Sequence, residues 1–336
     1  MPLDSLDPVR LALEVMRIDS TSGREGDVIA WMHRWLESRA WNVRRIPVTP
    51  GRDDLLATAT VAPRVTLSTH LDTVPPFIAP RLDGDRLIGR GACDAKGIAA
   101  AMCCAAERLR ERGVPVALLF VVGEEVTHDG AHAANQVATS SRVLIDGEPT
   151  ESRLALGTKG AVRALVHTSG RAAHSAYPEL GRSATADLVR LLSELDDLEL
   201  PSDAILGDTT INIGTLAGGL ADNVIAPSAE AKIMARIVGP VDEMLAILTR
   251  WAGDRATLKV GAVVPPVRLG SLPGFETSIV AYATDIPELT SWGTPYLFGP
   301  GSIHVAHTDE EFVDVRELRD AVGAYERIAI GALERS

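Results

Sequence analysis

Histidines and carboxylates follow the ends of several strand-like segments of this 336-residue chain. They are His70, Asp72, Asp94, Glu124, Glu125, Asp146, Glu148, His304 and His307. Imidazole nitrogen and carboxylate oxygen, without thiolate, are ligands that suit zinc, manganese or cobalt. Carboxylates that share one space repel one another and raise their own pKa values unless cations compensate them. These residue types therefore predict a hydrolytic site with two divalent metal ions, which lie about 3.5–4 Å apart in such sites.

The elements that must position these side chains alternate between helix and strand. Helical spacing covers 8–17, 26–39 and 96–112, and strand-like runs cover 42–48, 55–61, 65–69, 116–122 and 142–145. Several of the candidate residues come directly after such a strand. Because ligands bind at the carboxyl ends of strands in open α/β sheets, we expect the site at that edge of the sheet.

The pattern changes at about Gly160. Strand-like runs at 161–168, 209–216, 229–238 and 257–264 enclose helical runs at 181–196 and 240–252, in the order β-α-β-β-α-β. After Pro265 and Pro266 we expect the chain to return to helix, followed by a strand from Pro295 and a helix at 314–334. We therefore predict a discontinuous catalytic domain, 1–158 and 267–336, interrupted by a small α+β lid domain at 159–266.

Five segments in this order resemble the successive motifs of the M20 metallopeptidases. They are His70-Leu-Asp-Thr-Val-Pro75, Gly89-Arg-Gly-Ala-Cys-Asp-Ala-Lys-Gly97, Gly123-Glu-Glu125, Gly147-Glu-Pro-Thr150, and Gly299-Pro-Gly-Ser followed by Ala-His307. The resemblance covers the whole chain. It implies a mixed-sheet, zinc-exopeptidase-like catalytic domain with an inserted lid and dimerisation domain. That family includes acetylornithine deacetylase, succinyl-diaminopimelate desuccinylase, aminoacylase and carboxypeptidase G.

The resemblance also implies which residues would bind metal. His70 and Glu148 would bind one ion, Glu125 and His307 would bind the other, and Asp94 would bridge the two. Zinc is the expected metal, with cobalt or manganese as alternatives.

Two further residues of the same motifs receive roles in the reaction from the resemblance. Asp72 would hydrogen-bond the far nitrogen of His70 and fix its tautomer. Glu124 would be the general base that takes a proton from water and hands it to the leaving amine. In the family the peptide after the bridging aspartate is often cis, so we expect a cis Asp94–Ala95 bond.

Substrate contacts are implied in the lid domain and in one glycine-rich turn. His174 resembles a histidine that stabilises the oxyanion, usually across a dimer interface, and Asn223 an asparagine that contacts substrate. Arg236 matches an arginine that holds a substrate carboxylate, for which a planar guanidinium is well suited. The backbone N–H groups of Gly299 and Gly301 would approach the same ligand.

Some assignments stay open at the level of sequence. Asp146 and Glu148 lie on one face of their strand, so either could ligate, and the family motif favours Glu148. His304 competes with His307, which the family spacing favours. Arg236 could instead form an ion pair within its own strand pair.

Composition excludes several other classes of protein. Lys and Arg number 33 against 45 Asp and Glu, a net charge of −12 that disfavours binding to nucleic acid or anionic membranes. Three cysteines cannot form a disulfide framework, and no run approaches the ~20 apolar residues of a membrane span. The segment Met1–Asp7 does not resemble a signal peptide, so we expect a cytoplasmic protein.

The motifs most closely resemble the acetylornithine deacetylase and acyl-lysine hydrolase branch of the family. They predict removal of an acyl group from an N-acyl amino acid such as N-acetyl-ornithine or an N-acyl-lysine, in arginine or lysine biosynthesis. A dipeptidase or carboxypeptidase using the same centre is the alternative enzyme. A non-catalytic amino-acid-binding homologue is the alternative of another class, although every candidate base and ligand is retained. A homodimer through the lid domain is expected from the resemblance.

Overall fold

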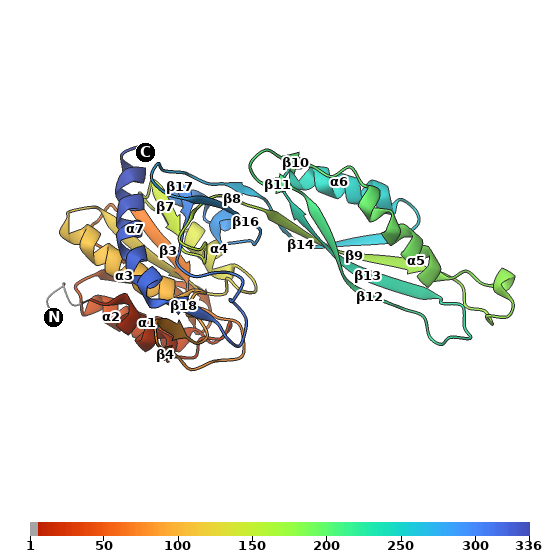
Figure 1. The fold of residues 1–336 in the computed structure, drawn as a ribbon, viewed down its shortest axis with the longest axis horizontal. Helices are drawn as coiled ribbons and strands as arrows, with labels where there is room; N and C mark the ends of the chain where they lie inside the picture. The colour runs from red at the N-terminus through yellow and green to blue at the C-terminus, as the bar shows by residue number, and fades with distance from the viewer. Residues whose placement is uncertain (1–5) are drawn as a thin grey trace. The chain divides into compact units, whose positions relative to one another are not determined.

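The computed structural model describes residues 6–336 and divides the chain into two units (Figure 1). The first unit contains the residues up to Leu156 together with Leu269–Ser278 and Thr284–Ser336. The second unit contains Gly157–Arg268 and Ile279–Ala283, the last of which lies outside the predicted lid boundaries of 159–266. Residues 1–5, part of the segment inspected for a signal peptide, lie outside the described residues.

A six-stranded mixed sheet forms the centre of the first unit, in the order β1-β2-β6-β3-β7-β17. The strands are β1 (Asn42–Thr49), β2 (Arg52–Thr58), β3 (Val65–His70), β6 (Val116–Val121), β7 (Val143–Asp146) and β17 (Thr294–Leu297). Strand β3 runs parallel to β6 and to β7, and β17 runs parallel to β7. The pairs β1–β2 and β2–β6 are antiparallel. The predicted α/β fold with a mixed sheet is therefore confirmed.

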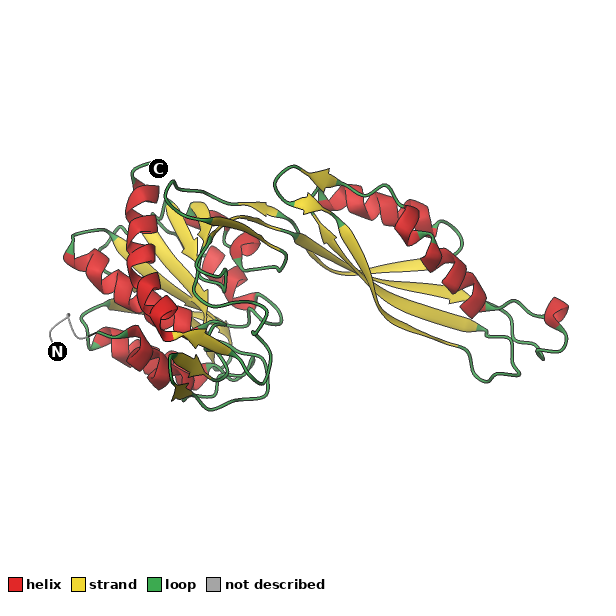
Figure 2. Cartoon of the chain, viewed as in Figure 1, coloured by secondary structure: helices red, strands yellow, loops and turns green. Residues whose placement is uncertain are grey.

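Both faces of this sheet are covered, as Figure 2 shows. Alternate residues of β6 point to opposite faces, so Leu118 and Phe120 join one core while Leu119 and Val121 join another. The larger core lies under α1 (Pro8–Met16), α2 (Gly26–Glu37), α3 (Lys96–Glu111) and α7 (Val315–Leu333). The smaller core lies under α4 (Asp129–Asn135) and two 3-10 turns, η4 (Ile286–Glu288) and η5 (Thr290–Trp292).

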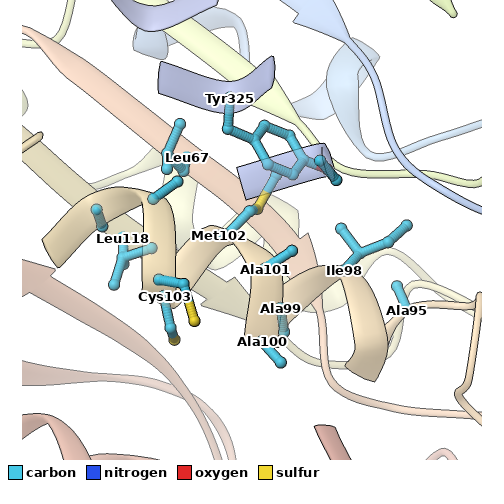
Figure 3. Packing of buried hydrophobic residues seen from close by; sticks show 14 of the residues in the cluster. Leu67, Ala95, Ile98, Ala99, Ala100, Ala101, Met102, Cys103, Leu118 and Tyr325 are labelled. Carbon is cyan, nitrogen blue, oxygen red and sulfur yellow. The ribbon is translucent and has the colours of Figure 1, made fainter. Parts of the chain in front are cut away.

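Helix α3 is central to the larger core because it is built from small residues. Ala99, Ala100 and Ala101 are fully buried, and Leu67, Leu118 and Tyr325 from three neighbouring elements pack around the helix (Figure 3). Small side chains allow a helix to lie close to the sheet and to a second helix. This packing fixes the start of α3, which begins at Lys96, two residues after Asp94.

A small three-stranded sheet lies beside the main sheet of the first unit, in the order β18-β5-β4. Its strands are β4 (Arg81–Asp83), β5 (Arg86–Ile88) and β18 (Phe312–Asp314). Strand β18 joins the loop after His307 to α7, and Asp314 caps α7 by accepting hydrogen bonds from the N–H groups of Arg316 and Glu317.

The second unit contains a four-stranded antiparallel sheet in the order β12-β13-β9-β14. Its main elements are β9 (Gly160–Ser169), α5 (Ala184–Ser193), β12 (Thr210–Gly218), β13 (Ser228–Ile237), α6 (Val241–Ala252) and β14 (Thr257–Val264). Short elements between α5 and β12 are the turn η3 (Leu195–Asp197) and the pair β10 (Ser202–Asp203) and β11 (Gly207–Asp208). Apolar residues of α5, α6 and alternate strand positions form one core on a single face of the sheet.

One expectation about secondary structure is wrong. No α-helix lies between Pro266 and β17 among the described residues; the chain forms β15 (Val267–Arg268), β16 (Thr277–Val280) and the two 3-10 turns instead. Gly270, Pro273 and Gly274 interrupt any helical run there, and β15 pairs with the chain at Thr158. Between residues 6 and 336, no helix combines the length and apolar character that crossing a membrane requires.

Candidate metal centre and active site

The candidate ligands lie where the parallel strands of the first unit end. His70 is the last residue of β3, Glu124 and Glu125 follow β6, and Glu148 follows β7. Because β3, β6 and β7 run in the same direction, their carboxyl ends meet at one edge of the sheet. The alternation of strands and helices thus brings together residues that are up to 78 positions apart in the chain.

His70 is almost wholly buried, and both of its ring nitrogens have partners. Nε2 lies 3.0 Å from Asp94 Oδ1 and 3.9 Å from Glu148 Oε1. Nδ1 lies 3.0 Å from the main-chain carbonyl oxygen of Asp72 and 3.5 Å from its carboxylate. When Nδ1 carries the proton, its N–H donates a hydrogen bond to the main-chain carbonyl oxygen of Asp72, which leaves Nε2 free to bind a metal ion.

Asp94 lies between the two histidines of the centre. Its Oδ1 faces His70, while its Oδ2 lies 3.1 Å from His307 Nε2. Burial raises the pKa of Asp94, but the hydrogen bonds from His307 and His70 lower it by more than burial raises it. The pKa of this carboxyl group therefore stays well below its usual value. The Asp94–Ala95 peptide is cis, as expected. One carboxylate thus presents a different oxygen to each histidine.

Glu125 completes the second half of the centre. Its carboxylate oxygens lie 3.1 and 3.0 Å from Nε2 of His307. Hydrogen bonds with Asp94 and Glu125 raise the pKa of His307 to about 10. His307 has a positive φ of 64°, in a loop that precedes β18.

The geometry bears on both pairs of alternatives that the sequence leaves open. Glu148 lies within 4 Å of the His70 ring, whereas no described residue forms an ion pair with Asp146, and its buried Oδ2 has no hydrogen-bond partner. His304 is exposed and contacts none of the carboxylates, whereas His307 contacts two. The arrangement favours Glu148 and His307.

The Asp72 carboxylate lies closer to the main-chain N–H groups of Glu124 and Glu125 than to the ring of His70. Oδ1 accepts a hydrogen bond from the N–H of Glu124 at 3.1 Å, and Oδ2 accepts one from the N–H of Glu125 at 3.2 Å. Ser22 Oγ donates to the same Oδ2 at 2.8 Å. Burial raises the pKa of Asp72, but these bonds and His70 lower it below its usual value. Asp72 therefore orients the turn that presents Glu124 and Glu125.

Glu124 lies beside the centre in a buried environment. Its side chain is only 11% exposed, and burial, partly opposed by His70, raises its pKa well above the usual value. His128 Nδ1 lies 3.9 Å from Glu124 and 2.7 Å from Asp285 Oδ1. The sequence motifs give no role to His128 or to Asp285. The spacing of four residues between Glu124 and His128 is the signal that could have found the pair.

The three candidate substrate residues of the lid segment belong to the second unit, and two of them are neighbours. The chain pairs at His174 and Val224, and the N–H of Ser175 donates to the carbonyl oxygen of Asn223 at 3.0 Å. The side chains of His174 and Asn223 are both exposed on these adjoining loops. His174 Nδ1 accepts a hydrogen bond from the N–H of Ala176 at 3.1 Å, which leaves Nε2 available.

Arg236 lies apart from these loops, in strand β13. Its side chain is half-buried, and no carboxylate among residues 6–336 pairs with it. Burial and the neighbouring charge of Arg163 lower the pKa of Arg236. Among residues 6–336, Arg236 therefore does not form the ion pair within its strand pair that the sequence left open as an alternative.

The two glycines of the turn after β17 have packing roles. The N–H of Gly299 donates to Thr150 Oγ1 at 3.0 Å, so it is already used inside the protein. A Cβ at Gly299 would overlap the main chain of Glu148, and one at Gly301, where φ is 85°, would overlap Cys93. Because Thr150 accepts the N–H of Gly299, this N–H does not reach a ligand as the resemblance implied.

Comparison with known proteins identifies the family. The model of the peptidase family M20/M25/M40 matches residues 66–330. The chain belongs to this family. A probable carboxypeptidase of Aspergillus clavatus is 38% identical, with 96% of this chain and 82% of that protein covered. A peptidase M20 domain-containing protein of Schizosaccharomyces pombe is 37% identical, with 96% of this chain and 84% of that protein covered. The crystal structure of aminopeptidase PepT from Bacillus cereus superposes with a TM-score of 0.81 at 19% identity, covering 96% and 97% of the two chains.

As a member of the M20 peptidase family, the chain is a metal-dependent hydrolase that acts on amide bonds. Its donor set fits that chemistry, because one ligand atom each of His70, Asp94 and Glu125 lie within 4.8 Å of one another. Several carboxylates in this buried space need cations to compensate their charge. Neither of these two relatives carries a name from the deacetylase or desuccinylase group, which the motifs led us to expect.

Proposed function

We propose that this M20 hydrolase is a peptidase that releases an amino acid from a small peptide, as a carboxypeptidase or dipeptidase does. The observation that carries the proposal is the placement of Asp94, which presents one oxygen to His70 and the other to His307. Such a carboxylate suits the bridge of a two-metal hydrolytic centre. The name of the Aspergillus clavatus relative, a probable carboxypeptidase, supports a peptide rather than an N-acyl amino acid as substrate.

The residues of the first unit would hold two divalent ions, with zinc as the first choice and cobalt or manganese as alternatives. His70 and Glu148 would bind one ion, Glu125 and His307 the other, and Asp94 would bridge them. When bound, such ions polarise the scissile carbonyl group and lower the pKa of water. The mixture of two imidazoles with carboxylates supports zinc over magnesium or calcium, which prefer oxygen ligands alone.

Glu124 would serve as the general base. Its raised pKa makes it a stronger base than an exposed carboxylate, and its near-complete burial protects the proton that it gains from exchange with bulk water. It would take a proton from the attacking water and donate that proton to the leaving amine. Asp72 supports this role because it orients the N–H of Glu124 and so fixes the position of the base.

Residues of the second unit would bind the substrate. Arg236 would hold the terminal carboxylate of the peptide, since no carboxylate of the described chain pairs with it. His174 would stabilise the oxyanion through its available Nε2, and Asn223 on the adjoining loop would contact the peptide. A homodimer through this unit stays a prediction.

A substrate panel tests the proposal. Release of amino acids would be measured from a free dipeptide, an N-terminally blocked dipeptide, a C-terminally amidated dipeptide and N-acetyl-ornithine, each with added zinc, cobalt or manganese. We expect the blocked and free dipeptides to be hydrolysed and the amidated dipeptide to be poor, because the amide removes the carboxylate that Arg236 would bind. Faster turnover of N-acetyl-ornithine than of every dipeptide would refute the peptidase proposal in favour of the deacylase.

A variant of Glu124 tests the proposed general base separately from metal binding. Replacement of Glu124 by Gln removes the base while keeping the size of the side chain, so hydrolysis should fall by about 100-fold or more. Binding of zinc should persist, because Glu124 is not among the proposed ligands. Unchanged hydrolysis in Glu124→Gln would show that another residue is the base.

A further inference from the structure

Glu311 is a buried carboxylate to which neither the motifs nor the proposed function gives a role. It follows His307 by four residues and has no solvent exposure. Its Oε2 forms an ion pair with Arg90 Nη1 at 2.7 Å, and the Arg90 side chain is only 1% exposed. A buried ion pair contributes little net stability, because desolvation offsets its attraction. Its retention beside the centre therefore requires a further reason.

The second oxygen of Glu311 supplies that reason. Oε1 accepts hydrogen bonds from three N–H groups of one loop, those of Gly91 at 2.9 Å, Cys93 at 3.3 Å and Asp94 at 3.3 Å. All residues of this loop are buried, so water could not replace Oε1 as the acceptor for these three N–H groups. The course of the loop up to the backbone of Asp94 thus depends on one carboxylate oxygen.

Main-chain contacts join the same two loops again. The N–H of Gly89 donates to the carbonyl oxygen of Glu311 at 2.9 Å, and Arg90 Nη1 donates to the carbonyl oxygen of Thr308 at 3.1 Å. One loop ends at Asp94, and the other begins at His307. The side chains of these two residues meet at 3.1 Å. Glu311 and Arg90 therefore connect the backbones that carry two of the proposed metal ligands.

We propose that Glu311 is a positioning residue that fixes Asp94 relative to His307 and thereby sets the affinity for the metal ion that these two side chains share. The inference rests on the proposed two-metal centre. Glu311 touches neither substrate nor metal ligand side chains in this role; it acts through the N–H groups that it holds. Removal of a group that orients metal ligands typically lowers metal affinity by about 10–100-fold.

Two double variants separate positioning from simple stability. In Arg90→Met with Glu311→Met, the ion pair is replaced by apolar side chains of similar length, which often preserves folding, but the three N–H groups lose their acceptor. In Arg90→Gln with Glu311→Gln, the charges are removed equally, yet an amide oxygen remains to accept from the loop. The two variants thus differ in whether residue 311 can hold the loop.

Zinc binding is the readout. Metal-free proteins would be titrated with Zn²⁺ in competition with a chelating dye, and unfolding by urea would be measured alongside. We expect the Met pair to bind one of its zinc ions about 10–100-fold less tightly than wild type, and the Gln pair to stay within about threefold. A Met pair that binds two zinc ions like wild type, or equal losses in both variants, would overturn the proposal.

Glu107→Gln, in α3, is the control for the loss of a buried carboxylate away from the centre. Glu107 is 1% exposed and accepts a hydrogen bond from Trp41 Nε1 at 3.0 Å. It lies eleven residues beyond the start of α3, about 16 Å along the helix axis. We expect this variant to lose stability without a change in zinc affinity. If its zinc affinity falls in proportion to its stability, positioning by Glu311 is not needed to explain the Met pair.

A second measurement covers the case in which the Met pair does not fold. Hydrogen exchange of peptides spanning 88–96 would be followed in metal-free and zinc-loaded wild-type protein. We expect protection already in the metal-free protein, because Glu311 holds the N–H groups of Gly91, Cys93 and Asp94 without metal. Rapid exchange that zinc alone slows would overturn the proposal. Wild-type protein that neither binds two zinc ions nor hydrolyses peptides would refute the proposed function instead.

Discussion

Asp54 offers a test of how burial raises the pKa of a carboxyl group, here one that lies close to the turn carrying Glu124. It lies on β2 with no solvent exposure; Oδ1 accepts a hydrogen bond from the N–H of Val122 at 3.1 Å, and Oδ2 has no partner. Burial, together with the charges of Asp285 and Asp129, raises the pKa of Asp54 to about 8. The folded protein therefore holds this carboxyl group in its neutral form at neutral pH.

The sign of the effect on stability follows from proton binding. Below about pH 4 the carboxyl group is protonated in both states, because its unfolded pKa is about 3.9. Between about pH 4 and pH 8 the folded state keeps the proton that the unfolded state has lost, so unfolding releases a proton. Stability from this group is thus complete at low pH and is lost as the pH rises to about 8.

The magnitude is large enough to measure. Each pH unit within this window changes the free energy of unfolding by about 1.36 kcal/mol, so the interval from pH 5 to pH 8 is worth on the order of 4 kcal/mol. Asp54→Asn cannot ionise and should lack this dependence. It should also lose a constant amount of about 1–3 kcal/mol, because its amide N–H groups replace an unpartnered oxygen. The free energy of unfolding of the variant should therefore be close to or slightly below that of wild type at pH 5 and should exceed it by pH 8.

Urea unfolding of both proteins at pH 5, 6, 7 and 8, without metal, would provide the free energies. The difference between the two proteins at each pH cancels the contributions of all other groups. Asp53→Asn is the control, because the neighbouring Asp53 side chain is 26% exposed and pairs with Arg45 at the surface. Its difference from wild type should be small and nearly constant. A difference for Asp54→Asn that also stays constant within about 1 kcal/mol would refute the argument from burial.

Three further outcomes follow from the site and its surroundings. Asp72→Asn should lower zinc affinity by about 10–100-fold, because one of the two oxygens that accept from the N–H groups of Glu124 and Glu125 becomes an amide donor; an unchanged zinc titration would contradict this role. His307→Ala should abolish tight binding of one of two zinc ions, counted by elemental analysis, whereas His304→Ala should bind both, since His304 is exposed and contacts no carboxylate. Gly97→Ala should lower the free energy of unfolding by about 1–3 kcal/mol, because its Cβ would overlap a carbonyl oxygen of the preceding loop. Gly323→Ala in α7 meets only the end of a flexible arginine side chain and should be neutral or stabilising, and equal thermal unfolding of the two variants would show the packing argument to be wrong.

Several of the proposed ligands have local signals in the sequence. His70, Glu125 and Glu148 each follow a strand whose apolar run is visible in the sequence, and parallel strands bring such residues to one edge. The alternation of strands and helices likewise predicted the mixed α/β fold. The segment after Pro266 was not predictable in the same way, because its short strands exist only through pairing with distant chain.

Side-chain partners depended on the tertiary structure. The family resemblance implied that Asp72 hydrogen-bonds His70, but only the folded chain places its carboxylate oxygens on the N–H groups of Glu124 and Glu125. Glu311 carries no local signal at all, because its three N–H partners lie more than 200 residues earlier in the chain.

The sequence by itself therefore determined the alternating strands and helices up to Pro266 and the polar residues that follow the strands, since apolar periodicity and motif spacing are properties of neighbouring residues. Only the tertiary structure shows that His307 rather than His304 contacts the carboxylates, that Glu148 rather than Asp146 lies near His70, and which buried groups contact these residues. Those choices depend on distances of a few ångströms between segments far apart in the chain, and such distances arise only when the strands pair and α3 packs against them.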